Sequence, residues 1–223
     1  MPFNIIVSEE SKNACPAFMG TAVFMNVHNT PSSQELRNEI YKTSELFRNK
    51  FTKDNIKDIP AIRATRQVYR NCGKDPSRYR PSGEALCRRI LTGKELYKVD
   101  TVVDLINLAS IIYGYSIGGF DADKIHGNKL ILGIGRKDEP YEGIGRGNIN
   151  IEGLPVYRDE TGGIGTPTSD NERTKLHETS SHLLAIINGY DGNINNVHAT
   201  ADYIIKLAKK YANGTNEEII DFS

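Results

Sequence analysis

The sequence has few cysteines and no long run of apolar residues. Its three cysteines, Cys15, Cys72 and Cys87, are an odd number without the spacing of a metal site, so we expect reduced, mostly buried thiols with neither a disulfide nor zinc. No apolar stretch reaches the ~18 to 20 residues that span a bilayer, and the start MPFNIIVSEE lacks the basic residues and long apolar stretch of a secretion signal. We therefore expect a cytoplasmic protein, and nothing in the sequence calls for a metal or a cofactor.

Nucleotide-binding motifs are also missing, although glycines cluster at 133–136, 143–146 and 162–165. A phosphate-binding loop needs Gly-Lys-Ser or Gly-Lys-Thr, which does not occur, and a dinucleotide fingerprint should open a helix. The chain after Gly147 reads as extended instead. The clusters favour hairpin turns and bulges, and the alternative is that small residues let the backbone of a substrate come close.

What is present is the ordinary composition of a globular protein. Of 223 residues, 38% are hydrophobic and 25% are charged, and the formal net charge is zero. We expect one unit over residues 1–223 with two interleaved lobes. A basic, helix-rich half covers 1–98, a pocket-forming half covers 99–212, and residues 213–223 form a tail.

The charge is unevenly distributed along the chain. Residues 35–98 contain 16 Lys plus Arg against 8 Asp plus Glu, whereas the remainder contains 12 against 20. The basic run comprises Arg63, Arg66, Arg70, Lys74, Arg78, Arg80, Arg88 and Arg89. Such a run either attracts a nucleic acid backbone or simply forms the solvated faces of two helices, and the sequence leaves both interpretations open.

Hydrophobic periodicity predicts the elements. Alternation predicts strands over 3–10 and 20–29, and later over 115–120, 129–135, 154–159 and 182–189. Helical spacing predicts a helix after a capping box formed by Ser32 and Glu35, another over 60–71, and a last one over 200–211, with a polar tail after Gly214 that frays. The expected fold is α+β, with a mainly antiparallel sheet packed with helices.

Two helices at the centre of the chain carry the most informative pattern, one between Ser82 and Gly93 and one from Asp100 to Tyr113. We expect Ser82 and Asp100 to cap them. The second helix is apolar on a broad surface, yet Asp104, Asn107 and Ser110 recur at every third position along one edge. Burying any of these groups unpaired costs ~1–3 kcal/mol, so neighbours, water or a ligand must satisfy them.

A second polar cluster lies just before the apolar segment 182–189. It comprises Thr166, Thr168, Ser169, Asp170, Glu172, Arg173, Thr174 and Lys175. By composition alone this is a loop held by Asx and Ser/Thr turns. The functional alternative is that it forms one wall of a pocket.

Three motifs carry a resemblance to a known family: VDLIN at 103–107, GGFDADKI at 118–125 and SDNERTKL at 169–176. They resemble the editing module of bacterial phenylalanyl-tRNA synthetase beta subunits, its third and fourth structural domains, over about residues 18–211. The resemblance implies the fold of that editing domain and a tRNA or aminoacyl-tRNA partner. It also implies an aminoacyl pocket between the central helices and the later sheet, with segment 165–174 facing Asn107. With no flanking domains, the chain is similar to free-standing members of the family.

The family's site residues carry over only in part. Asn107 matches the second member of a Thr-Asn pair whose first member is Ile106 here. The family's pocket histidine falls on Gly118, and the glutamate that reads the tyrosine hydroxyl would lie near Ala185 or Ile186. The implied substrate pocket comprises Asn107, Ser110, Gly118, Gly165, Thr166, Thr168, Asp170 and Arg173. The implied RNA-binding residues are Arg63, Arg66, Arg70, Arg80, Arg88 and Arg89.

Two functions of different classes follow. The first is a deacylase that hydrolyses a mischarged tRNA, since an aminoacyl ester needs mainly a positioned water and hydrogen bonds to the oxyanion. The catalytic base is unknown; His126, His177 and His182 are candidates by residue type alone, and a structural role is the alternative for each. The second function is a non-catalytic module that binds an amino acid or RNA and has lost the editing residues.

Overall fold

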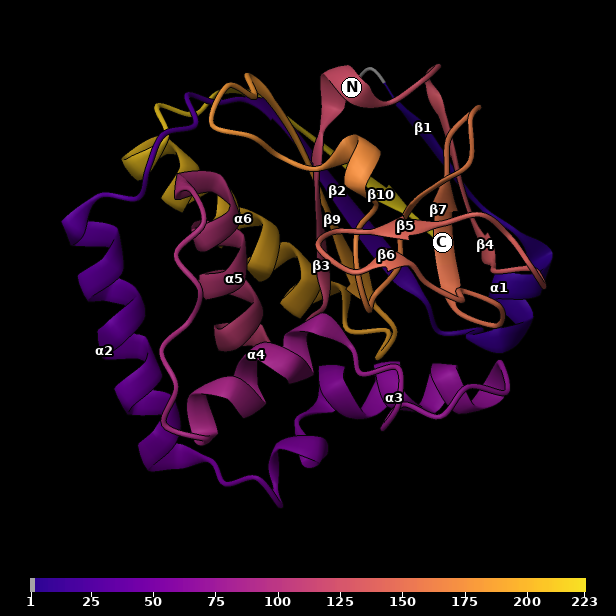
Figure 1. Ribbon diagram of the computed structural model, residues 1–223, viewed down its shortest axis with the longest axis horizontal. Coiled ribbons are helices and arrows are strands. Elements are labelled where there is room, and N and C mark those ends of the chain that lie inside the picture. The colour runs from indigo at the N-terminus through magenta and orange to yellow at the C-terminus, as the bar shows by residue number, and fades with distance from the viewer. Residues whose placement is uncertain (1–2) are drawn as a thin grey trace.

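The computed structural model describes residues 3–223 and contains two four-stranded sheets beside a group of helices (Figure 1). The first sheet is antiparallel throughout, in the order β10-β2-β9-β3. Its strands are β2 (Met19–Asn26), β3 (Ile117–Asp121), β9 (His182–Gly189) and β10 (Thr215–Phe222). The prediction of an α+β fold with mainly antiparallel pairing is confirmed.

The second sheet has the order β1-β4-β7-β8, and only its β1-β4 pair is parallel. Its strands are β1 (Asn4–Val7), β4 (Lys129–Ile134), β7 (Pro155–Arg158) and β8 (Gly163–Gly165). A small hairpin of β5 (Glu142–Gly143) and β6 (Gly147–Asn148) lies beside it. The glycine clusters of the sequence thus fall in strands and a hairpin, as their sequence context favours.

Helix α5 (Thr101–Tyr113) is the central helix of the fold (Figure 1). Its broad apolar surface is buried against α6 (Ile194–Tyr211), α2 (Gln34–Lys50) and α4 (Ser82–Leu91), and it shares one hydrophobic core with β2 and β9. Helix α3 (Pro60–Asn71) runs below the strands in the view of Figure 1, and α1 (Glu9–Ala14) lies against β4. Three short 3₁₀ turns, η1 (Ile56–Asp58), η2 (Ala122–Lys124) and η3 (Glu172–Thr174), complete the elements.

The predicted boundaries of α5 are confirmed, whereas two predicted caps are wrong. Asp100 accepts a hydrogen bond from the Val103 N–H at 2.8 Å, and Gly114 ends the helix in the left-handed region with φ of 81°. Helix α2 is capped by Ser33, because the Ser32 hydroxyl donates to Asp104 instead. Ser82 is already helical, and its N–H donates to the carbonyl of Pro167 at 2.7 Å.

The expected fraying of the tail after Gly214 is wrong. Strand β10 pairs along β2 through residues 215–222, so it covers an edge that would otherwise expose unpaired backbone groups. Phe222 at its end packs on Phe18 and Tyr157. The last helix also begins earlier than predicted, at Ile194, because Asn193 caps it. Within residues 3–223, none of the helices has both the length and the hydropathy to cross a membrane.

Candidate functional site

A cavity of about 390 Å³ lies between α4, α5, β3 and the segment 165–176. Its apolar lining comprises Leu86, Val99, Val103, Ile106, Ile117, Ile144 and Leu176, together with Gly119. Its polar lining comprises Ser82, Asn107, Ser110, Thr166, Ser169, Asp170 and Lys175. The structure therefore brings four predicted pocket residues, Asn107, Ser110, Thr166 and Asp170, around one space.

The helical repeat explains how α5 contributes to this cavity. Val103, Ile106, Asn107 and Ser110 are spaced i, i+3, i+4 and i+7, so all four lie on one face of the helix. The residues between them, such as Leu105 and Ala109, are fully buried in the core. One helix thus supplies both part of the core and one wall of the cavity.

Glycine allows β3 to approach α5 closely at this point. A Cβ atom on Gly119 would come within 2.7 Å of Ile106 Cδ1, so a larger residue would displace the cavity wall. The neighbouring Gly118 and Gly165 serve a different contact: a Cβ on either would lie 2.6 Å or less from the ring of Phe120. Gly118 and Gly165, both predicted as pocket positions, therefore pack on Phe120 and do not line the cavity.

Asp170 is the most strongly perturbed group of the cavity. Its Oδ2 accepts the Gly119 N–H at 3.1 Å. Burial nevertheless raises the pKa of this carboxyl to about 7, because the charged form is poorly solvated there. No ion pair joins Asp170 to a cation in the part of the chain that the structure describes, since the nearby Lys175 is paired with Glu172.

Two polar side chains of the cavity have no hydrogen-bond partner in the described part of the chain. The Ser110 side chain, 2% exposed, and the amide of Asn107 make no hydrogen bond to another residue among 3–223. Thr166 differs, because its hydroxyl donates to the Ser169 carbonyl and accepts the N–H groups of Thr168 and Ser169. Asn107, Ser110 and Asp170 are thus available to a ligand, whereas Thr166 shapes the wall.

Two predicted pocket residues have other contacts. Thr168 is buried, hydrogen-bonded to the Tyr69 hydroxyl at 2.8 Å and to the carbonyl of Tyr79 at 3.2 Å. The Arg173 guanidinium forms an ion pair with Asp159 at 2.8 Å. Both residues attach the segment 165–176 to distant elements, and neither lines the cavity. The positions of Thr168 and Arg173 are set by Tyr69 and Asp159, which lie 99 and 14 residues away along the chain.

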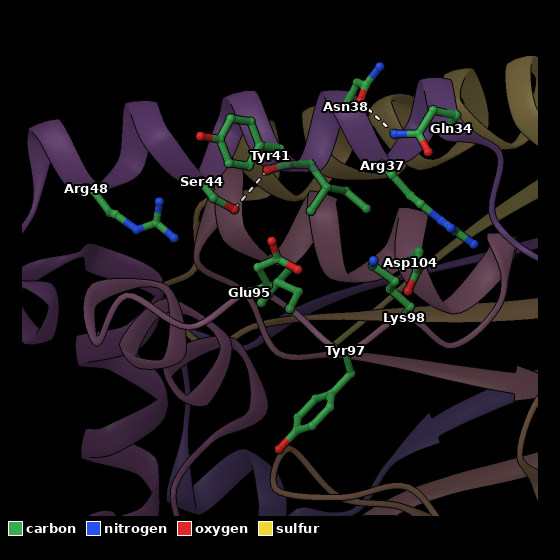
Figure 2. Close-up of a pocket in the computed structure, with 12 residues that line it drawn as sticks. Gln34, Arg37, Asn38, Tyr41, Ser44, Arg48, Glu95, Tyr97, Lys98 and Asp104 are labelled. Carbon is green, nitrogen blue, oxygen red and sulfur yellow. Dashed lines mark hydrogen bonds between the residues drawn. The ribbon is translucent and has the colours of Figure 1, made fainter.

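Asp104 lies at a second, smaller cavity of about 200 Å³ between α2 and residues 95–98 (Figure 2). Steps of three residues advance a helix by 300°, so Asp104 and Ser110 point about 120° apart around α5. The predicted polar edge is therefore divided between two cavities. Burial raises the pKa of the Asp104 carboxyl, although its Oδ2 accepts the Ser32 hydroxyl at 2.6 Å. In this cavity Arg37 and Lys98 also lie near the carboxyl (Figure 2).

The predicted RNA-binding arginines fall into two groups. Glu84 is fully buried and pairs with Arg66 at 2.9 Å, with Arg88 at 2.8 Å and, more distantly, with Arg80. The Arg89 guanidinium stacks over Tyr97. Arg63 and Arg70 are exposed on α3 and make no ion pair with another described residue, so they are the two free cations of the predicted set.

No histidine lines the 390 Å³ cavity in the described chain. His182 pairs with Asp123 at 2.9 Å and stacks on Phe24, and His126 contacts Thr161. His177 is exposed. Residues 3–223 also contain no group of three or more side chains suited to a metal ion, and all three cysteines are free. Sequence reasoning missed Ser82 as a lining residue, because it assigned that hydroxyl to a helix cap.

A model of the B3/4 domain matches residues 64–221. The chain belongs to the B3/4 domain family. This domain occurs in the beta subunit of phenylalanyl-tRNA synthetase, so the predicted relationship is confirmed.

Among solved structures, the fold is similar to an N-terminal fragment of the phenylalanyl-tRNA synthetase beta subunit from Pyrococcus horikoshii. The TM-score is 0.50 at 12% sequence identity, and the match covers 100% of this chain and 51% of the other. The chain thus spans about half the length of that fragment, and what the two share is the fold. A comparison with curated proteins gave no significant match.

Proposed function

We propose that this B3/4 domain is of the aminoacyl-tRNA editing type and that its 390 Å³ cavity binds the aminoacyl group at the end of a tRNA. The observation that carries the proposal is that Asn107, Ser110 and Asp170 meet above an apolar floor. Neither the Asn107 nor the Ser110 side chain has a hydrogen-bond partner among residues 3–223, and the Asp170 carboxylate has no cation partner there. A concave, mostly apolar space with a few convergent polar groups is the usual form of a ligand site. A cytoplasmic location, where tRNA is charged, is part of the same proposal.

The proposed reaction is hydrolysis of the aminoacyl ester. Water attacks the ester carbonyl, the carbonyl–ribose bond breaks, and the products are a free amino acid and an intact tRNA hydroxyl. The amide N–H groups of Asn107 and the hydroxyls of Ser110 and Ser82 are donors of the kind that stabilise a developing oxyanion. Orientation of the water and the ester would supply the remaining acceleration.

The residues of β9 argue against tyrosine as the amino acid. Ala185 and Ile186, where the family would carry an acid that reads the tyrosine hydroxyl, are both fully buried in apolar cores. Gly118, at the position of the family's histidine, has no side chain to contribute. A hydroxyl-bearing side chain would therefore lose its hydrogen bonds to water without compensation.

The exposed face of α3 is the proposed contact for the tRNA backbone. Arg63 and Arg70 are free to approach phosphate, whereas Arg66, Arg80 and Arg88 surround Glu84, whose charge offsets part of theirs. The RNA contact is therefore smaller than the arginine content of residues 63–89 predicts.

Incubation of the protein with a panel of mischarged tRNAs tests this function. Release of amino acid above the buffer rate from at least one of them is expected, and Asn107→Ala should slow it about 10²-fold if the amide stabilises the oxyanion. The matched control is Asn49→Ala, at an exposed position of α2, which should leave the rate unchanged. Equal rates with and without protein for every tRNA would reject hydrolysis.

The second candidate is a binding module without hydrolysis. It is favoured by the absence of a histidine from the lining of the cavity. The same panel separates the two functions, because a binding module retains aminoacyl-tRNA on a filter at low salt and releases no amino acid.

A further inference from the structure

The 390 Å³ cavity contains a carboxylate that no cation among residues 3–223 neutralises. Asp170 is partly buried between β3 and β8, where a Cβ atom on Gly165 would lie 3.0 Å from its Oδ1. Its one described side-chain hydrogen bond is the N–H of Gly119 on Oδ2. A carboxylate in such a place normally acquires an opposite charge or loses its own.

The other charged groups at this cavity do not provide that opposite charge. Lys175 lines the cavity, but its ammonium is paired with the carboxylate of Glu172. A divalent metal would need more oxygen ligands than one carboxylate supplies, and the described residues contain no cluster that provides them. The missing charge is thus one that a ligand can bring.

The rest of the lining limits what that ligand is. Leu86, Val103, Ile106, Ile117 and Leu176 form an apolar surface next to the carboxylate. Asn107 and Ser110 add uncharged hydrogen-bonding groups on the α5 side. A compact ligand with an ammonium group, an apolar arm and a carbonyl group would match these three features together.

We propose that Asp170 binds the α-ammonium group of an aminoacyl ligand whose apolar side chain lies against Leu86, Val103 and Ile106. This inference rests on the proposed function and specifies its substrate class: amino acids with an apolar side chain and a free amino group. An N-acylated amino acid is excluded, because it has no charge to pair with Asp170 and adds bulk beside it. Asp170 is thus a specificity residue, separate from the groups that act on the ester.

Calorimetric titration with two amides at pH 7.5 tests the proposal. L-Leucinamide has a free ammonium group and no reactive ester, and N-acetyl-L-leucinamide lacks the charge. A charge-assisted hydrogen bond contributes ~1.5–3 kcal/mol, which corresponds to about ten- to a hundredfold in affinity. We expect L-leucinamide to bind the wild type at least tenfold more tightly than the acetylated amide.

Asp170→Asn should remove this preference. It should weaken L-leucinamide at least tenfold and leave the acetylated amide unchanged, while Asp202→Asn, at an exposed position of α6, should behave as the wild type. Circular dichroism of each variant verifies folding. Failure of L-leucinamide to bind the wild type, equal binding of the two amides, or full affinity in Asp170→Asn would each overturn the proposal.

These experiments distinguish failure of the Asp170 proposal from failure of the proposed hydrolase function. Amide binding that depends on Asp170, without deacylation of any tRNA, would leave this inference standing and reject the hydrolase. Deacylation that persists in Asp170→Asn, with an unchanged preference for free over N-acetylated aminoacyl groups, would support the hydrolase and reject this inference.

Discussion

Asp170→Asn should make the free protein more stable at neutral and alkaline pH. The carboxyl titrates near pH 7 in the folded protein against 3.8 in the unfolded chain, because burial disfavours its charge. The folded state therefore binds more protons than the unfolded state across this window, and the free energy of unfolding falls as the pH rises through it. With 1.36 kcal/mol for each pH unit, the loss by pH 8 is ~4 kcal/mol.

Asparagine removes this titration and keeps an oxygen that accepts from Gly119. Urea unfolding of both proteins at several pH values between 4 and 8 measures the effect. The free energy of unfolding of the variant, minus that of the wild type, should grow by ~4 kcal/mol from pH 4 to pH 8. A gain in stability at the cost of ligand binding is the usual signature of a functional site.

Asp159→Asn is the matched control, with the opposite sign. Burial alone would raise the pKa of Asp159. The Arg173 guanidinium and three backbone N–H groups outweigh burial and hold this pKa below its ordinary value. This carboxylate stabilises the fold above pH ~4 and loses that contribution as the pH falls through its folded pKa. Its variant should therefore be the less stable one at pH 8. Parallel profiles of stability against pH for wild type and Asp170→Asn would show that burial does not raise the pKa of Asp170.

Three further predictions concern the fold and its charged face. Glu84→Gln leaves the guanidinium groups of Arg66 and Arg88 without their buried partner and should cost ~3–5 kcal/mol in denaturant unfolding; a loss below 1 kcal/mol would contradict this. Reversing Arg63 and Arg70 to Glu should weaken RNA binding and flatten the plot of log affinity against log salt without changing the melting temperature; an unchanged salt slope would reject the α3 contact. Removal of residues 215–223 should expose the edge of β2 and cause aggregation; a monomeric, equally stable truncation would show that β10 is dispensable.

Local pattern was sufficient to predict much of the fold. The helix over 60–71 and the strand over 182–189 have the bounds that periodicity gives, and Asp100 caps α5 as its residue type predicts. These features depend on neighbours within a few positions in the chain. The strand β10 does not: it begins with polar residues and is exposed along most of its length, with only Phe222 buried. Pairing with the open edge of β2, almost 200 residues away in the chain, makes this segment a strand.

The candidate site was predictable to a similar extent. Asn107, Ser110 and Asp170 meet as the resemblance implies. Thr168 and Arg173 are polar residues of the same segment as Asp170, but contacts with Tyr69 and Asp159 hold them away from the cavity. Glu84 likewise engages arginines that look free in the sequence. Pairings of this kind depend on tertiary packing, which residue type and spacing do not encode. The division of the chain into lobes at residue 98 remains a prediction.

A crystal structure with a non-hydrolysable aminoacyl nucleoside, 3′-deoxy-3′-(L-leucylamino)adenosine, is the most direct test of the central claim. We expect the leucyl group to fill the 390 Å³ cavity, with its ammonium group on Asp170 and its carbonyl oxygen within hydrogen-bond distance of Asn107 or Ser110. Binding of the leucyl group anywhere else on the protein, with this cavity left to solvent, would contradict it.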